Sequence, residues 1–238
     1  MQGKNNSLSK GLIILKEFML SKEPLRASFL CKKFNIDKST MSRILQSLIG
    51  ENFIEYKNDS KEMILSDLQR TIIEKEDRKK IVLKTSALLD EIFYLSGECA
   101  YIGILERDSV LYLNQVDKSK RLIKTKESIG LHAPLHTNAF GKILLAFLSL
   151  DILNLKLKKY TPSTITSHKK LAQELELVKK RAYAFGMQEH EFGLCSLAIP
   201  YFNSRKEFIG AVGISGLSIR LSEAVLHQLA KKMLSLRR

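Results

Sequence analysis

Apolar side chains recur at helical spacing three times within the first 65 residues. The run "LSKGLIILKEFM" predicts a first helix with one apolar face. After the turn marked by Pro24, "LRASFLCKKF" predicts a short second helix. The run "KSTMSRILQSLIG" predicts a third helix, which starts behind an N-cap at Asp37 and closes at Gly50. Three helices that each have one face to bury predict a small compact unit.

The third predicted helix has two faces of different chemistry. Its apolar stripe follows the spacing i, i+3, i+4, i+7 and consists of Met41, Ile44, Leu45 and Leu48. The opposite face is short, polar and singly basic and consists of Ser39, Ser42, Arg43 and Gln46. A face that enters the major groove of DNA needs small hydroxyl groups near phosphates and a few long donors for base edges. The polar face is therefore a candidate for base recognition.

A basic hairpin follows the third helix. The β-type runs "FIEY" and "EMIL" surround the turn "KNDSKE". Two helices, a recognition helix and a hairpin, in this order, predict a winged helix-turn-helix domain over residues 1–65. We expect four of its residues near phosphates: Lys38, Thr40, Lys57 and Lys61. A protein–protein adaptor that uses the same helices as an interaction surface is an alternative.

The pattern changes after residue 65 and indicates a second domain. Residues 66–80 are mostly charged, which predicts a solvated linker helix. Residues 81–238 begin with an amphipathic helix that ends at Gly97. They continue with the predicted strands "CAYIGIL", "VLYLNQV", "RLIKTKESI", "SLAIPYF" and "FIGAVGIS" and the predicted helices "LAQELELVKKRAYAF" and "SEAVLHQLAKKML", the last capped by Ser222. This order predicts an α+β domain.

The composition of the chain indicates the kind of partner that it binds, and the sequence contains no recognisable targeting signal. The formal net charge of +14 favours an anionic partner such as nucleic acid. The surplus is spread along the chain, with 11 basic against 7 acidic residues in 1–65 and 22 against 14 in 86–238. The 3 cysteines lie far apart, which indicates reduced thiols rather than a disulfide framework. With no apolar run long enough to span a membrane and no apolar signal core, we expect a cytoplasmic protein without a membrane partner.

The segment "GLHAPLHTNAFGKILLAF" resembles a chemical site but fails the tests for a metal site and for a phosphate-binding loop. Pro134 between His132 and His136 disfavours a helical metal site. A phosphate-binding loop would need glycine at His136 and a hydroxyl residue at Ile143. We therefore expect no catalytic residue, metal or cofactor. A small-molecule hydrolase or transferase with a fused helical domain remains the alternative from another functional class.

Taken as a series of motifs, the chain resembles the IclR family of bacterial transcriptional regulators from about Leu8 to its C-terminus. The likeness is carried, in the family's order, by "LSKGLIIL", "IDKSTMSRILQSL", "PLHTNAFGKILLAFL", "YTPSTIT", "LELVKKRAYAF", "EHEFGLCSLAIP" and "VGISGLSIRLS". The resemblance implies a winged helix that binds double-stranded operator DNA and a GAF-like C-terminal domain that binds a small effector. It also implies a homodimer or homotetramer. The expected function is a regulator, in the first place a repressor, of a metabolic operon that responds to an organic acid or sugar derivative.

The resemblance also implies where the effector binds. In relatives that bind small keto acids, main-chain groups of the two residues before the Gly-Lys pair hold the ligand, and here these are Ala139 and Phe140. This agrees with the general affinity of helix N-termini for anions. The expected site consists of Ala139, Phe140, Gly186, Leu194, Cys195 and Ser196.

Several of these positions depart from the family's pattern. Gly186 stands in place of an acid, Cys195 of an arginine and Ser196 of a cysteine. Phe140 replaces a small residue, which predicts a narrower pocket or a surface that stacks on a ring-shaped ligand. Ala182 stands where the family usually has a helix-ending glycine.

Overall fold

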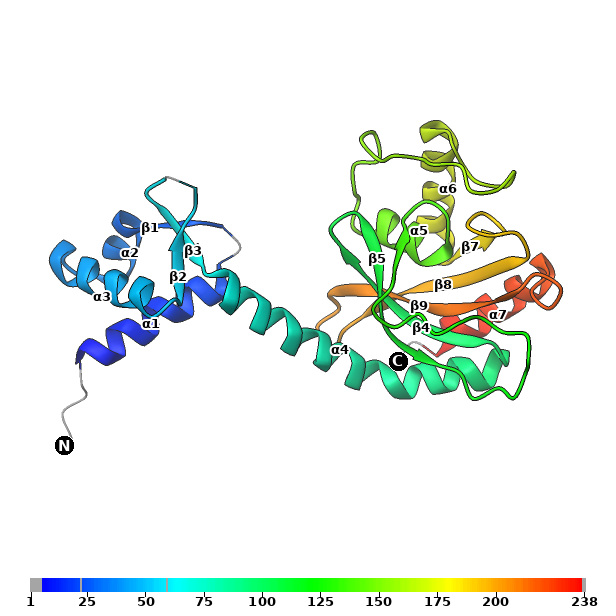
Figure 1. Ribbon diagram of the computed structural model, residues 1–238, viewed down its shortest axis with the longest axis horizontal. Coiled ribbons are helices and arrows are strands. Elements are labelled where there is room, and N and C mark those ends of the chain that lie inside the picture. The colour runs from blue at the N-terminus through cyan, green and yellow to red at the C-terminus, as the bar shows by residue number, and fades with distance from the viewer. Residues whose placement is uncertain (1–5, 22, 59, 237–238) are drawn as a thin grey trace. The chain divides into compact units, whose positions relative to one another are not determined.

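The computed structural model describes residues 6–21, 23–58 and 60–236. The chain divides into two compact units, Met1–Lys79 and Lys80–Arg238. Figure 1 shows the helices and strands of both units.

The N-terminal unit contains the predicted helices and hairpin, with one further short strand. Its elements are α1 (Asn6–Leu20), β1 (Leu25–Arg26), α2 (Ala27–Phe34), α3 (Lys38–Gly50), β2 (Ile54–Tyr56) and β3 (Glu62–Leu65). The strands form an antiparallel sheet in the order β1-β3-β2. One core joins helices and sheet and includes Ile14, Phe18, Leu30, Met41, Leu45, Ile54 and Met63. The winged helix-turn-helix order is thereby confirmed.

Two turns of this unit depend on asparagine in the left-handed region. Asn35 ends α2 with φ 51°, and its backbone N–H donates to the Cys31 carbonyl. Helix α3 ends at Gly50, as predicted, and the left-handed residue of the turn that follows is Asn52 with φ 56°. Asparagine tolerates this conformation better than other residues with a side chain.

Helix α4 (Asp67–Ser96) runs without interruption for 30 residues. It contains the predicted linker, residues 66–80, except Ser66, and the predicted first helix of the second domain. No glycine or proline lies between Asp67 and Ser96, so nothing in the local sequence ends the helix earlier. The division between the two units falls inside it, after Lys79.

The C-terminal unit is an antiparallel sheet with helices on both faces. Its remaining elements are β4 (Cys99–Glu106), β5 (Ser109–Val116), β6 (His132–Pro134), α5 (Ala139–Phe147), α6 (His168–Arg181), β7 (Ala184–Met187), β8 (Leu194–Phe202), β9 (Phe208–Leu217) and α7 (Glu223–Ser235). The strand order is β6-β5-β4-β9-β8-β7. The last turns of α4 and the helix α7 pack on one face, and α5 and α6 on the other (Figure 1). The predicted α+β class is confirmed.

One predicted strand is wrong. The segment "RLIKTKESI", residues 121–129, has no strand, although its alternation resembles one. Leu122 is fully exposed and Ile123 is 68% exposed, so the apolar side chains have no sheet face to pack on. The segment is held instead by side-chain hydrogen bonds, such as the one between the Thr125 and Tyr101 hydroxyls at 2.7 Å.

The end of α6 differs from its prediction as well. The helix stops at Arg181, and Ala184 to Met187 form β7 rather than a last helical turn. Ala182 lies between them in the left-handed region with φ 59°, and its N–H donates to the Val178 carbonyl. The Cβ of an alanine costs about 1 kcal/mol in this conformation, which explains why glycine suits the position better.

Candidate DNA-binding face and effector site

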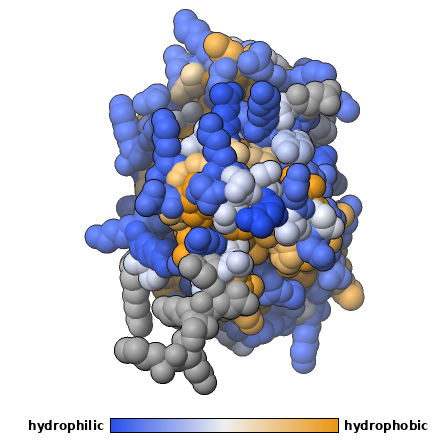
Figure 2. Space-filling view, turned by 90° about the vertical axis from the view of Figure 1, so that its left-hand side faces the viewer, coloured by the Kyte–Doolittle hydropathy of each residue, from blue (hydrophilic) through white to orange (hydrophobic). Residues whose placement is uncertain are grey.

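The predicted base-reading residues lie together on the outer face of α3. Ser39, Ser42, Arg43 and Gln46 are all exposed. The other face of the helix is anchored by Met41, which is fully buried, and Leu45, which is 5% exposed. Because the buried stripe fixes the rotation of the helix, the polar face is presented to solvent as a unit. Figure 2 looks at the N-terminal unit and shows a mostly hydrophilic surface with small hydrophobic areas.

The first turn of α3 is held by its N-cap. The Asp37 carboxylate accepts hydrogen bonds from the Thr40 backbone N–H at 2.9 Å and the Ser39 hydroxyl at 2.7 Å. These donors, the Thr40 amide foremost, hold the pKa of Asp37 well below its ordinary value. The cap stays anionic, and the Ser39 proton is used within the protein. Ser42, Arg43 and Gln46 are thus the more available donors.

The hairpin residues Lys57 and Lys61 are exposed on both sides of the β2–β3 turn. Asp59 lies outside the described residues. The two glutamates of the hairpin strands are each paired with an arginine. Glu62 binds Arg26 at 3.1 Å, and Glu55 binds Arg70 at 3.0 Å. Pairing neutralises these carboxylates, so the lysines dominate the local charge.

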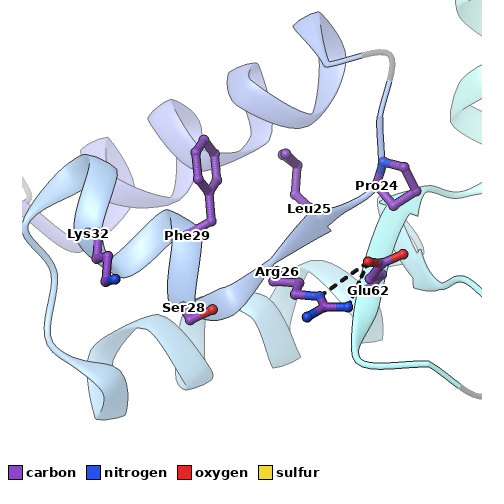
Figure 3. Close-up of a pocket in the computed structure, with 7 residues that line it drawn as sticks. All are labelled: Pro24, Leu25, Arg26, Ser28, Phe29, Lys32 and Glu62. Atoms are coloured by element: carbon purple, nitrogen blue, oxygen red, sulfur yellow. Dashed lines mark hydrogen bonds and ion pairs between the residues drawn. The ribbon is translucent and has the colours of Figure 1, made fainter.

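A surface hollow of about 480 Å³ lies beside the start of α2 (Figure 3). It is lined by Pro24, Leu25, Arg26, Ser28, Phe29, Lys32 and Glu62. The guanidinium of Arg26 is held by Glu62, as the dashed lines show. This leaves Lys32 as the unpaired cation among the described lining residues.

The predicted effector loop folds back on the start of α5 through Asn138. The Asn138 Oδ1 accepts from the Gly141 N–H at 2.9 Å, and its Nδ2 donates to the Pro134 carbonyl at 2.8 Å. A Cβ at Gly141 would lie 2.1 Å from the Leu135 carbonyl oxygen, so only glycine fits where the chain crosses itself. The chain therefore reverses tightly just before α5.

Three predicted effector residues meet at the start of α5. The Ala139 backbone N–H donates to the Ser196 Oγ at 3.1 Å. Ser196 pairs with Gly186 across β7 and β8. A Cβ at Gly186 would lie 2.4 Å from the Ser196 Oγ and 3.1 Å from the Ala139 nitrogen. The serine hydroxyl therefore occupies the space that glycine leaves, and an anion that approaches the Ala139 amide has to displace it.

Phe140 forms part of the core beneath this point. It is fully buried, and its ring meets those of Tyr101 and Tyr112 edge-on at 6.0 and 5.4 Å. Burial raises the pKa of both tyrosines, which remain neutral phenols. Phe140 thus fills the space between α5 and strands β4 and β5 with an aromatic cluster.

The last two predicted effector residues, Leu194 and Cys195, begin β8. Leu194 is half-buried, and its N–H donates to the Glu191 carbonyl. Cys195 is 1% exposed and belongs to the cluster packed against α4 and α7. Neighbouring strand residues point to opposite faces, so Cys195 faces away from the side of β8 where Ser196 meets Ala139. The structure does not bring Cys195 to the site, and burial raises the pKa of its thiol.

A buried ion pair beside the site was not predicted from the sequence. The Lys142 Nζ binds the Glu189 Oε1 at 2.6 Å and donates to the Phe185 carbonyl at 2.9 Å. Lys142 and Glu189 are 2% and 6% exposed. The Glu189 Oε2 has no hydrogen-bond partner among the described residues. A lysine inside the apolar run "GKILLAF" needs a buried anion, and this signal could have predicted the pair.

The histidines of the loop have structural partners. His132 contacts the Ser109 hydroxyl at 2.8 Å and Glu106 at 3.1 Å, and His136 contacts the Lys158 carbonyl at 3.0 Å. Among the described residues, no group of three or more His, Cys, Asp or Glu side chains is arranged to hold a metal ion. In the same part of the chain, no helix combines the length and hydrophobicity that crossing a membrane requires.

Comparison with known proteins identifies both units. The family model "IclR helix-turn-helix domain" matches residues 7–58, and "Bacterial transcriptional regulator IclR C-terminal" matches residues 74–237. The glycerol operon regulatory protein of Streptomyces griseus is 28% identical over 222 residues, which cover 90% of this chain and 86% of that protein. The transcriptional repressor IclR of Escherichia coli is 25% identical over 232 residues, which cover 93% and 83%.

A solved structure supports the same fold. The IclR of Thermotoga maritima superimposes with a TM-score of 0.61 at 24% identity, covering 98% of this chain and 96% of that one. The matching families and relatives are DNA-binding transcriptional regulators, not enzymes, and their C-terminal domains bind small-molecule effectors. With both family models matched in order along its length, the chain belongs to the IclR family of bacterial transcriptional regulators.

Proposed function

We propose that this chain is a repressor of a metabolic operon. A small carboxylate or sugar-derived effector controls the affinity of the repressor for its operator. The observation that carries the proposal is the exposed polar face of α3, fixed by a buried stripe and free of acidic side chains. The names of the relatives, a glycerol operon regulator and a transcriptional repressor, support the type of gene and the sign of the control.

In this proposal the N-terminal unit reads DNA with Ser42, Arg43 and Gln46, and Ser39 contributes its oxygen as an acceptor. Lys38, Thr40, Lys57 and Lys61 lie near phosphates and fix the register. These side chains are exposed or half-buried on α3 and beside the hairpin turn. Arg43 is the side chain best suited to a guanine edge, because its guanidinium can donate two parallel hydrogen bonds.

We further propose that the protein acts as a homodimer or a larger homo-oligomer. Helix α1 carries a second apolar stripe that faces solvent. Leu8, Leu12, Met19 and Leu20 are 60%, 57%, 53% and 70% exposed. Large apolar side chains gathered on one helix indicate an association surface. Two copies would present two α3 helices to half-sites about 34 Å apart, one turn of DNA.

The effector site of the proposal is the start of α5, with Ala139, Phe140, Gly186, Leu194 and Ser196. A carboxylate there would replace the Ser196 hydroxyl at the Ala139 amide. The Phe140 ring is fully buried, so in this proposal it forms a wall of the site and does not stack on the ligand. Cys195 would act only indirectly, through the packing of β8 against α4 and α7.

A gel-shift titration tests the whole proposal. DNA from beside the protein's own gene should be retarded more strongly than random DNA of equal length. A thermal-shift screen of organic acids and sugar acids should then find a compound that weakens the complex. Retardation of both DNAs alike would remove sequence recognition, and no retardation at all would favour the adaptor function.

Gly186→Ala isolates the effector site from the DNA-binding face. The added Cβ has no room beside Ser196 and Ala139, so the compound found in the screen should lose its effect on the complex. Binding of the effector-free protein to DNA should stay within a factor of two. Ser204→Ala, in the exposed β8–β9 turn, is the matched control and should behave like the unaltered protein. An unchanged response in Gly186→Ala would place the effector elsewhere.

A further inference from the structure

A second hollow, of about 590 Å³, lies on the α4–α7 face of the C-terminal unit. Its walls come from α4, from the end of β8, from β9 and from the end of α7. Ser196, on β8, faces α5, whereas the wall residues Ile199 and Tyr201 pack on the opposite side of the sheet with α4 and α7. The hollow is therefore separate from the proposed effector site at α5.

The floor and sides of this hollow are apolar. Ile199, Val212 and Met233 are at most 1% exposed and belong to the core beneath it. Leu88 and Leu236 are half-buried at its edges. A volume near 590 Å³ with such walls falls within the usual range of small-molecule sites.

Polar groups without protein partners converge at the rim. Lys84 comes from α4, Lys206 from the β8–β9 turn, and Tyr201 brings a hydroxyl from β8. Among the described residues, neither ammonium group has an ion pair and the Tyr201 hydroxyl has no hydrogen bond. Lys118, which also borders α4, pairs with Asp90 at 2.7 Å. Glu91 is the one acid among the described lining residues, so two cations face one anion.

We propose that this hollow binds an amphiphilic organic anion, a carboxylate that carries an aliphatic chain or an aromatic ring. The carboxylate would lie between Lys84 and Lys206, with the Tyr201 hydroxyl as a further donor. The apolar part would lie along Leu88, Val212 and Met233. Charge complementarity selects this occupant, because an uncharged apolar molecule would gain nothing from the two ammonium groups.

Such a ligand would connect three elements that meet at the hollow. It would hold the Lys84–Glu91 turns of α4 to the β8–β9 turn and to the end of α7. Any molecule that binds only the packed arrangement stabilises it in proportion to the logarithm of its concentration. The ligand would therefore stabilise the packing of α4 against the sheet. This effect would not require an effector at the start of α5.

The chain has no tryptophan, which permits a clean fluorescent reporter. Ala87 is exposed and lines the hollow, so Ala87→Trp places a single indole at the ligand's edge. Titration of the full-length protein with octanoate should give a saturable fluorescence change. Octanol lacks the charge and acetate lacks the chain, and each should bind at least ten-fold more weakly. Leu83→Trp, one turn earlier on α4 and 76% exposed, should show no saturable change.

Lysine variants in the Ala87→Trp background assign the charge. Lys84→Gln combined with Lys206→Gln should weaken octanoate binding at least ten-fold, whereas Lys231→Gln, exposed on α7, should leave it unchanged. Equal binding of octanol, or no loss in the double variant, would overturn the anion site. A fluorescence change that depends on protein concentration rather than octanoate would show that a second copy covers the surface. Loss of the signal in Gly186→Ala would place the ligand at α5 and overturn the proposal.

Discussion

The two units carry their candidate residues in opposite ways. On α3, Ser42, Arg43 and Gln46 face solvent and have no task in holding the fold. At the start of α5, Ala139, Phe140 and Ser196 are buried and already bonded or packed. The first surface can be changed without disturbing its scaffold. The second cannot, since the residues proposed to bind the effector are also parts of the core.

This difference has a consequence for ligand exchange in each unit. A DNA phosphate or base edge meets hydrated side chains and displaces only water and counterions. An effector at α5 has to break the hydrogen bond between Ala139 and Ser196 before it can use the amide. If the effector binds at α5 as proposed, sensing in the C-terminal unit would therefore involve a local rearrangement, whereas DNA contact by the N-terminal unit would not require one.

The largest expected effect is a loss of stability when the buried ion pair beside the C-terminal site is broken. Lys142→Met leaves Glu189 buried without its cation and should lower the free energy of unfolding by about 3–5 kcal/mol. The double variant Lys142→Met with Glu189→Gln should recover much of that loss. Arg43→Ala, on the exposed face, should change the free energy of unfolding by less than about 0.5 kcal/mol. Urea denaturation of the three proteins measures all of these values, and similar losses in Lys142→Met and Arg43→Ala would refute the contrast.

The next effect concerns function rather than stability. Arg43→Ala should weaken operator binding by about 1–3 kcal/mol and affect random DNA much less, because it removes the proposed base contact. Lys57→Ala should weaken both alike and reduce the salt dependence by about one phosphate contact. Fluorescence anisotropy at several salt concentrations separates the two outcomes. Equal losses on both DNAs for Arg43→Ala would reduce its role to a phosphate contact.

A smaller effect of known sign is expected at the end of α6. Ala182→Gly should stabilise the C-terminal unit by about 1 kcal/mol at most, because it relieves the left-handed strain of a residue with φ 59°. Ala172→Gly, at an exposed position within the same helix, should destabilise it by about 0.5–1 kcal/mol. Thermal unfolding followed by circular dichroism compares the two substitutions. A shift of the same sign in both would argue against strain at Ala182.

The smallest effect is a pH dependence confined to the first turn of α3. The folded-state pKa of Asp37 lies below its unfolded value of about 3.9, so its capping contribution is complete above that pH. The contribution is lost only as the pH falls through the lower folded value. Hydrogen exchange at the Thr40 amide should thus stay slow down to pH values below about 3.9. Asp37→Asn should remove this acid transition, and loss of protection already at pH 4 to 5 would contradict the lowered pKa.

Local periodicity predicted most of the N-terminal unit. The buried and exposed faces of α3 follow from helical spacing, and the hairpin follows from two β-type runs around a turn. Local pattern also misled, since "RLIKTKESI" alternates like a strand yet Leu122 and Ile123 have no sheet face to bury them. Where packing is absent, alternation alone does not make a strand.

The C-terminal site depends on contacts between distant residues. Gly186 and Ser196 meet Ala139 only through the register of β7 and β8, and Lys142 meets Glu189 across 47 residues. Family resemblance, not spacing, placed Ala139, Gly186 and Ser196 at one site, and it did not predict the pair of Lys142 and Glu189. Strand alternation could have removed Cys195 from that set, because Cys195 and Ser196 are neighbours and only one can face α5.

Ionic strength is expected to affect the long helix α4 as well as the contacts with DNA. From Thr71 to Lys80 every side chain is exposed or half-buried, so this stretch depends on helix propensity and on neighbouring charges. The pairs Arg78–Glu74 and Lys79–Glu76 are local and screened by salt. Added salt would weaken phosphate contacts at α3 and, at the same time, lower the stiffness of the helix that connects the units. The salt dependence of DNA binding would then reflect the stiffness of α4 as well as the strength of the phosphate contacts.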